Sequence, residues 1–134
     1  MMKCTALPLK TQALRALREH SGAAAVEFAM TVPILLTVIL GIFEFGRLLW
    51  AQNALHYAVE QAARCRTIDV ATCDNVGDTQ TYASTVSAFT FPTSAFTVTT
   101  PSCGNLVSAS YSFQFVVSLF GTGPTLTAQA CFPT

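Results

Sequence analysis

One acid, Glu27, stands in a stretch of residues that is otherwise apolar, GAAAVEFAMTVPILL, at positions 22–36. A charged side chain at the centre of a membrane helix costs about 3 kcal/mol or more, and acids in such places are usually functional. Glu27 is therefore the first candidate for a functional side chain. The alternative is a position at headgroup level near a helix N-terminus, where the helix dipole favours an anion by about 0.3–1 kcal/mol.

The cysteines are the second group of residues that could do chemistry, at Cys4, Cys65, Cys73, Cys103 and Cys131. Removal of a short N-terminal segment would leave four, and an even set in a Ser- and Thr-rich region indicates two disulfides in an oxidising compartment, rather than isolated thiols in the cytosol. Three pairings are possible. We place Cys65 with Cys73 first because they are close in sequence. That choice leaves Cys103, in a turn, with Cys131, which requires a bend in the chain.

No residue pattern typical of an enzyme or a metal site is present in the sequence. It contains no nucleophile elbow, no phosphate-binding loop, no CxxC pair and no Cys/His cluster with zinc spacing. His56 is the only histidine after residue 22, and a surface or packed histidine explains it better than a ligand or a catalyst does. We expect no enzymatic activity, no metal and no cofactor.

Charge is distributed unevenly along the chain, although the formal net charge is zero. Residues 1–22 carry four basic side chains against one acid, a net charge of +3, and residues 23–134 carry three basic side chains against six acids, a net charge of −3. The second region lacks the basic surface of a nucleic-acid-binding protein, so no nucleic acid is expected as a partner. The basic first region predicts a cytoplasmic N-terminus for a membrane helix that follows it.

The element that positions Glu27 is a predicted membrane helix. Residues 28–43 are uncharged, and residues 23–43 contain Glu27 as their only charge, a length close to the roughly 20 residues that a spanning helix needs. The run ends in GIFEFGRLLW, without an A-x-A cleavage site, so we interpret it as an uncleaved span rather than a secretory signal peptide. Pro33 is expected to do no more than kink this helix.

The helical pattern continues beyond the apolar run, over residues 44–66. One apolar stripe stands at helical spacing, formed by Leu48, Leu55, Val59 and Ala62. We therefore predict one helix of about 40 residues, the first half in lipid and the second half in water.

Four side chains of this second half have expected roles that need no ligand. Glu44 and Arg47 stand at i,i+3 and are expected to form a solvated ion pair at the membrane edge, with the orientation of subunits in a filament as the alternative. Trp50 fits the end of an interfacial aromatic belt, and Tyr57 is expected in the core of the outer domain.

The composition changes at Thr67 to Ser, Thr, Asp, Gly and Pro, which predicts a loop. Asp78 is expected as the N-cap of a short helix that stops before Pro92. Three strands follow in the sequence, AFTVTT, LVSASYSFQFVVSL and TLTAQACF, at residues 95–100, 106–119 and 125–132. The apolar stripe of the helix can cover the buried face of their sheet. The predicted fold class is α+β, with a long N-terminal helix, transmembrane and then amphipathic, packed on a small antiparallel three-stranded sheet.

A basic leader, Gly22, the sequence AAAVEF, an apolar helical run and GIFEFGRLLWAQNALHYAVEQAAR together resemble the TadE-like minor pilins, or pseudopilins, of the Flp/Tad class of type IV pilus systems. The resemblance covers mainly residues 14–66. It implies a pilin-like fold with four regions: a basic prepilin leader at 1–22, the transmembrane half of the helix at 23–43, its extracytoplasmic half at 44–66, and a small disulfide-containing α+β domain at 67–134.

The resemblance also implies roles for four residues. In such families a membrane aspartyl prepilin peptidase cleaves after the glycine, which implies cleavage between Gly22 and Ala23. Glu27 is then the fifth residue of the mature chain, followed by the aromatic Phe28, and its implied role is in assembly, where the N-terminal amine of a neighbouring subunit neutralises its carboxylate. Ala23 departs from the Phe or Met common at this place in other type IV pilins, so N-methylation is not implied.

The implied function is that of a structural subunit, a minor pilin that initiates, caps or regulates assembly of Flp/Tad pili used for adhesion and surface colonisation. Its implied partners are inner-membrane lipid, the prepilin peptidase, other pilin subunits and the pilus assembly platform. The implied location is the bacterial inner membrane, with a cytoplasmic N-terminus and a periplasmic C-terminal domain, and then the extracellular pilus. The alternative is a bitopic membrane protein that keeps its N-terminus and binds a ligand or partner with its outer domain.

Overall fold

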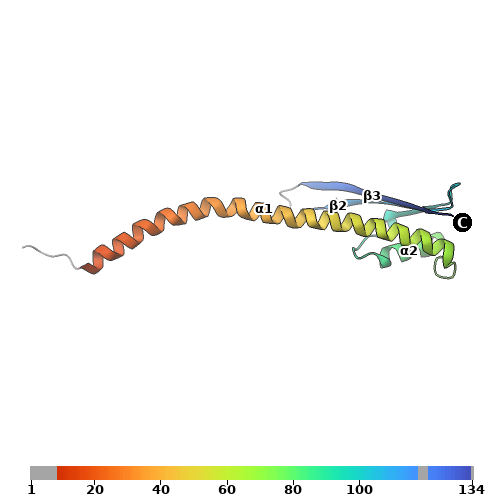
Figure 1. The fold of residues 1–134 in the computed structure, drawn as a ribbon, viewed down its shortest axis with the longest axis horizontal. Coiled ribbons are helices and arrows are strands. Elements are labelled where there is room, and N and C mark those ends of the chain that lie inside the picture. Colours follow the sequence, from red (N-terminus) through yellow and green to blue (C-terminus); the bar gives the residue numbers. More distant parts are fainter. Residues whose placement is uncertain (1–8, 118–120, 134) are drawn as a thin grey trace, which may run out of the picture. The chain divides into compact units, whose positions relative to one another are not determined.

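The computed structural model describes residues 9–117 and 121–133, with side chains from residue 22 onward. The helices are α1 (Leu9–Ile68), α2 (Val76–Val86) and a short 3-10 helix, η1 (Thr93–Ala95), and the strands are β1 (Phe96–Thr99), β2 (Asn105–Gln114) and β3 (Thr122–Phe132) (Figure 1). The predicted fold class, α+β with a long N-terminal helix and a small antiparallel sheet, is confirmed. Cys4 and the first residues of the predicted leader lie outside the described residues.

Helix α1 is continuous over 60 residues, longer than the predicted 23–66. The extension toward Leu9 contains TQALRALREH, which is rich in residues with high helix propensity. Pro33 lies inside the helix, where the hydroxyl of Thr37 donates a hydrogen bond of 2.7 Å to the Pro33 carbonyl. The chain forms two compact units, one ending at Gly41 and the other beginning at Ile42, and α1 contributes residues to both.

Helix α2 begins one turn earlier than predicted. Its N-cap is Asn75, whose side-chain oxygen accepts the Asp78 N–H at 2.9 Å, while the Asn75 amide donates to the Asp78 carboxylate at 2.7 Å. The expectation of Asp78 as the N-cap was wrong because Asn75, three residues earlier, satisfies the first free N–H groups of the helix. The helix ends at Val86, with Ser87 as its C-cap.

The sheet has the strand order β1-β2-β3, and both pairs are antiparallel. Strand β3 starts at Thr122 rather than 125 and includes Gly123 and Pro124. Proline fits here because β3 is an edge strand and its pairing with β2 is irregular between Ser112 and Gln114. A side chain at Gly123 would meet the Phe113 carbonyl at 2.3 Å, so only glycine lets the two strands approach this closely.

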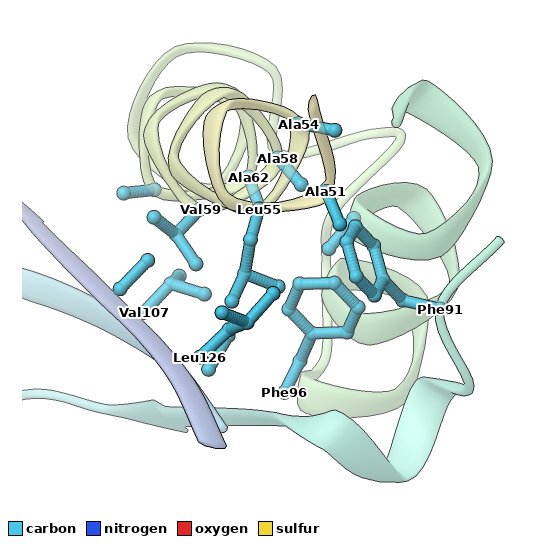
Figure 2. Packing of buried hydrophobic residues seen from close by; sticks show 14 of the residues in the cluster. Ala51, Ala54, Leu55, Ala58, Val59, Ala62, Phe91, Phe96, Val107 and Leu126 are labelled. Carbon is cyan, nitrogen blue, oxygen red and sulfur yellow. The ribbon is translucent and has the colours of Figure 1, made fainter. Parts of the chain in front are cut away.

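The core of the second unit lies between α1 and the sheet (Figure 2). Leu55, Val59 and Ala62 are fully buried, as is Val107 on β2, which confirms both the helical stripe and the alternation of β2. The core is completed by side chains from α2, the segment after it and the strands: Ala83, Phe91, Phe96, Ala109, Phe113, Leu126 and Ala128.

Tyr57 is 49% exposed, so its expected place in the core was wrong. It follows the buried Leu55 by two residues, and at 100° per residue this places the two side chains on opposite faces of α1.

Candidate processing and assembly site

Four residues implied in processing and assembly lie within α1, in the first unit: Gly22, Ala23, Glu27 and Phe28. All four are exposed. Ala23 and Glu27 stand four residues apart and therefore share one face of the helix, one turn from each other. A side chain at Gly22 would meet no other atom within 4 Å, so the packing of this chain does not itself require a glycine there.

The Glu27 carboxylate makes no hydrogen bond and no ion pair within the described part of the chain. Its main-chain carbonyl and that of Phe28 accept bonds of 3.1 Å from the hydroxyl of Thr31, which leaves the side chain unaffected. Any partner of this carboxylate lies outside the described side chains.

The helix around Glu27 presents apolar side chains on all sides. Within the described residues, Gly22–Ile68 is the segment that is long and apolar enough to cross a membrane, and none of its most apolar 18-residue window is buried in the protein. So many exposed apolar side chains on one helix require apolar surroundings, which a bilayer or neighbouring helices provide.

Glu44, at the start of the second unit, has surroundings opposite to those of Glu27. It is only 5% exposed. One carboxylate oxygen accepts the N–H groups of Val116 and Val117 at 2.9 and 3.2 Å, and the other accepts a bond from Arg47 at 2.7 Å. The carboxylate thus joins α1 to the segment that follows β2.

The expectation of a solvated Glu44–Arg47 pair was wrong for Glu44. Glu44 precedes Leu48 by four residues, Ala51 by seven and Leu55 by eleven, so it lies on the face of α1 that packs against the sheet. That spacing was the signal in the sequence that could have revealed its burial. Arg47 remains partly exposed, and its guanidinium lies 5.3 Å from the centre of the Phe113 ring.

Strand β2 is shorter than predicted. The alternating pattern continues to residue 119, but β2 ends at Gln114. Beyond this point Val116 and Val117 donate their N–H groups to Glu44 rather than to a neighbouring strand.

Two disulfides are present, Cys65–Cys73 and Cys103–Cys131, with Cα separations of 5.9 and 6.3 Å. They are the pairs that the sequence analysis placed first. The first ties the end of α1 to the loop before α2. The second joins the turn before β2 to the end of β3, where Cys131 pairs with Leu106 across the sheet.

The bend required at Cys103 is made by Gly104. This residue has φ of +121°, and a side chain there would meet the Phe132 carbonyl at 2.1 Å. Glycine alone tolerates both the backbone conformation and the close approach.

His56 is exposed on α1, and its Nε2 lies 2.8 Å from the amide nitrogen of Gln52, which also donates to the Thr127 carbonyl at 3.0 Å. These contacts are those of a surface histidine. Among the residues that the structure describes, no group of three or more His, Cys, Asp and Glu side chains could hold a metal ion.

Residues 22–64 match the model of a family described as TadE-like protein. This segment is TadE-like. The match confirms the resemblance stated from the sequence, and it begins at Gly22, the residue after which cleavage is implied. No curated protein and no solved structure matches the chain.

The TadE-like match covers less than half of the chain, and it includes both Glu27 and Glu44. It associates the protein with Tad pilus systems and with a membrane. The TadE-like family is not known for enzymatic activity. The sheet and α2 lie beyond the matched residues.

Proposed function

We propose that this chain is a prepilin-peptidase-processed minor pilin, or pseudopilin, that takes part in the initiation, capping or regulation of Flp/Tad pilus assembly. This proposal rests mainly on the residues at the start of the TadE-like segment. The segment begins at Gly22, and an exposed, unpartnered acid follows five residues later on an apolar helix. An adhesive filament for surface colonisation is the assembly in which such a subunit acts.

Processing at Gly22 requires a local change in α1. A peptidase binds its substrate in extended form, whereas Gly22 lies within the helix. Glycine makes unwinding cheaper, because it stabilises a helix by about 1 kcal/mol less than alanine. The small side chains of Gly22 and Ala23 also suit a cleft at the membrane edge. The proposed partners at this stage are the prepilin peptidase and inner-membrane lipid.

Cleavage after Gly22 would create a positively charged α-amino group close to the carboxylate of Glu27. The α-amino group of Ala23 is charged at neutral pH, and Glu27 lies one turn further along α1. In a bundle of such helices, the amine of one subunit neutralises Glu27 of the next and lowers the cost of keeping the carboxylate in an apolar setting. The proposed partners at this stage are other pilin subunits and the assembly platform.

The proposed topology places the basic residues before Gly22 in the cytoplasm and the disulfide-containing domain, residues 67–134, in the periplasm. The charge asymmetry of the sequence supports this orientation, and two disulfides fit an oxidising compartment. Residues 23–43 form the transmembrane half of the helix in this proposal, and residues 44–66 form the half that carries the outer domain.

Co-expression with a prepilin peptidase, followed by intact-mass measurement and N-terminal sequencing, tests the proposal. The expected product starts at Ala23. The variant Gly22→Val should keep its leader, while the control Gly46→Val should be processed like the wild type. Gly46 is a matched control because a side chain there also meets no atom within 4 Å. A product that retains Met1 would contradict the proposal and favour a bitopic protein with an uncleaved N-terminus.

A further inference from the structure

The two edges of the sheet are closed to different degrees. Strand β1 is four residues long, and its Phe96 carbonyl accepts a hydrogen bond of 2.7 Å from the Gln80 amide of α2. Strand β3 is eleven residues long, and from Thr125 to Phe132 it carries no charged side chain and no proline. Charges and prolines are the usual features that keep a sheet edge from pairing with another chain. The second half of β3 therefore lacks this protection.

Alternate residues of β3 direct their main-chain groups away from β2. In an antiparallel pair, the N–H and C=O groups of one residue face the partner strand, and those of the next residue face the opposite side. The Thr127 carbonyl accepts a hydrogen bond of 3.0 Å from Gln52 of α1, so Thr127 is one of the outward residues. Gln129 and Cys131 follow at the same spacing of two, so their main-chain groups also face outward.

The other edge of the sheet gives the same alternation independently. The Phe96 carbonyl faces α2 rather than β2, so its partner in β2, Ala109, directs its main-chain groups toward β3. Ala109 pairs with Ala128, which makes Ala128 an inward residue and Thr127 an outward one. Among the residues that the structure describes, the outward main-chain groups of β3 beyond Thr127 bond to no other element. A further strand can therefore pair there without breaking an existing bond.

An open cleft of about 380 Å³ lies at this edge, between β3 and α1. Gln129 and Ala130 project to opposite faces of the sheet, and both line the cleft, which places it beside the strand rather than over one face. Helix α1 forms the opposite wall, where Glu60 and Arg64 are exposed. An edge strand facing a helix across a cleft is suited to binding an extended peptide by strand addition.

The wall formed by α1 offers one acid and one base. In the described part of the chain, neither Glu60 nor Arg64 takes part in an ion pair, and the Arg64 guanidinium lies 5.8 Å from the centre of the Phe132 ring. Four residues of helix rise about 6 Å, and two residues of a strand span about 7 Å. A bound strand with opposite charges two residues apart therefore matches both side chains.

This spacing also indicates the kind of partner. Gln52 of α1 bonds to Thr127 of β3, and further along both elements Arg64 lies beside the Phe132 ring, so the two elements run in the same direction. A strand antiparallel to β3 consequently meets Arg64 before Glu60, and it needs an acid followed two residues later by a base. The sequence of this chain contains no acid and base two residues apart, which favours a different protein over a second copy.

We propose that β3, from Thr127 to Cys131, binds an extended segment of another protein chain as a fourth, antiparallel strand of the sheet. The segment carries an acid that pairs with Arg64 and, two residues later, a base that pairs with Glu60. Antiparallel pairing is the more stable form per residue. The inference concerns the outer domain alone and does not depend on the proposed cleavage or on the proposed role in a filament.

Two capped heptapeptides test the charge pairing: TTETKTT, with the acid before the base, and TTKTETT, with the order reversed. Threonine favours an extended strand and adds no charge. Fluorescence anisotropy of the labelled peptides, titrated with the full chain in detergent micelles, gives both affinities. We expect TTETKTT to bind about threefold more tightly, because exposed ion pairs contribute modestly to an affinity.

An exchange of the two charges on α1 tests the residues themselves. The double variant Glu60→Lys and Arg64→Glu keeps the net charge of the chain and should prefer TTKTETT by about the same threefold factor. The control Asp74→Lys replaces an exposed acid outside the cleft and should retain the wild-type preference. Far-UV circular dichroism verifies that each variant is folded.

Amide hydrogen exchange, followed by NMR on the labelled full chain in micelles, locates the bound peptide. TTETKTT should slow the exchange of the Gln129 and Cys131 N–H groups by about tenfold, because these groups become part of a ladder. The exchange of the Val98 N–H, on the edge formed by β1, should not change.

Several results would overturn the proposal. The first is equal binding of the two peptides, a wild-type preference for TTKTETT, or no binding of either. The second is protection of Val98, or no protection of Gln129 and Cys131. The third is protection of Gln129 and Cys131 in the free chain that increases with its concentration, since the edge would then bind a second copy. Each of these results would leave the proposed cleavage after Gly22 unaffected.

Discussion

Glu27 and Glu44 are two acids of the same helix in opposite surroundings. Glu27 is exposed, and its carboxylate has no partner in the described part of the chain. Glu44 is buried and accepts hydrogen bonds from Arg47, Val116 and Val117. Both lie next to apolar residues in the sequence, and both belong to the TadE-like segment.

The two acids differ in the partners that the described part of the chain gives them. The charge of Glu44 is compensated by hydrogen bonds and an ion pair within its own chain. Glu44 therefore has a structural role, and its replacement should lower the free energy of unfolding. The charge of Glu27 is uncompensated in an apolar setting, which costs free energy in a membrane until a partner arrives. Stability and assembly should therefore respond to different acids, and three variants test this separation.

The largest effect is expected from Glu27→Ala. If the carboxylate pairs with a neighbouring subunit, its removal should reduce incorporation of the subunit into filaments by about tenfold or more, since each lost 1.4 kcal/mol corresponds to a factor of ten. Immunoblots of the sheared filament fraction, compared with whole cells, measure incorporation.

The matched control for this variant is Glu60→Ala, which removes an exposed acid further along α1 and should assemble normally. The unfolding free energy of Glu27→Ala should stay within about 0.5 kcal/mol of the wild type, because an exposed side chain without partners is replaced. Wild-type incorporation of Glu27→Ala would remove the proposed role of this acid.

An intermediate effect is expected from Glu44→Ala. The substitution leaves the N–H groups of Val116 and Val117 without their acceptor and leaves Arg47 without its partner, which should lower the unfolding free energy by about 2–3 kcal/mol. Denaturant unfolding of the full chain in detergent, monitored by near-UV circular dichroism, gives this value. A change no larger than that of Glu60→Ala would show that Glu44 does not hold Val116 and Val117 in place.

The smallest effect is expected from Arg47→Met. Arg47 is partly exposed, so its ion pair with Glu44 is screened by water and contributes about 0.5–1 kcal/mol at most. Methionine keeps an apolar side chain near the Phe113 ring, while Glu44 keeps both main-chain donors. The same unfolding experiment should rank Arg47→Met clearly below Glu44→Ala. The reverse order would mean that the ion pair, rather than the bonds to the main chain, secures this region.

Most of the fold follows from the periodicity of the sequence. The stripe from Leu48 to Ala62 and the alternation of β2 are strong patterns because each repeats over several turns or residue pairs, and the core that they predict is present. Tyr57 was predicted wrongly although its spacing of two residues from Leu55 already places it on the opposite face of α1. The N-cap of α2 was misplaced because Asn75 and Asp78 both have side chains that can cap a helix.

The contacts of Glu44 could not be read from the sequence in the same way. Its position on the packed face of α1 follows from its spacing to Leu48, but its partners Val116 and Val117 lie more than 70 residues away. No local pattern reports that these main-chain groups bond to a carboxylate on another element. For Glu27 the described residues supply no side-chain partner at all, and its assembly role stays a prediction.

The absence of charge on the sheet also determines how its contacts respond to the surrounding medium. Attraction between charged surfaces is screened by dissolved ions over a Debye length of about 8–10 Å at physiological ionic strength. The strands and α2 beyond Asp78 carry no such side chains, so contacts made by these residues alone should not weaken when salt screens charges. In the proposed filament, contacts between these uncharged residues would therefore persist when the salinity around the cell changes.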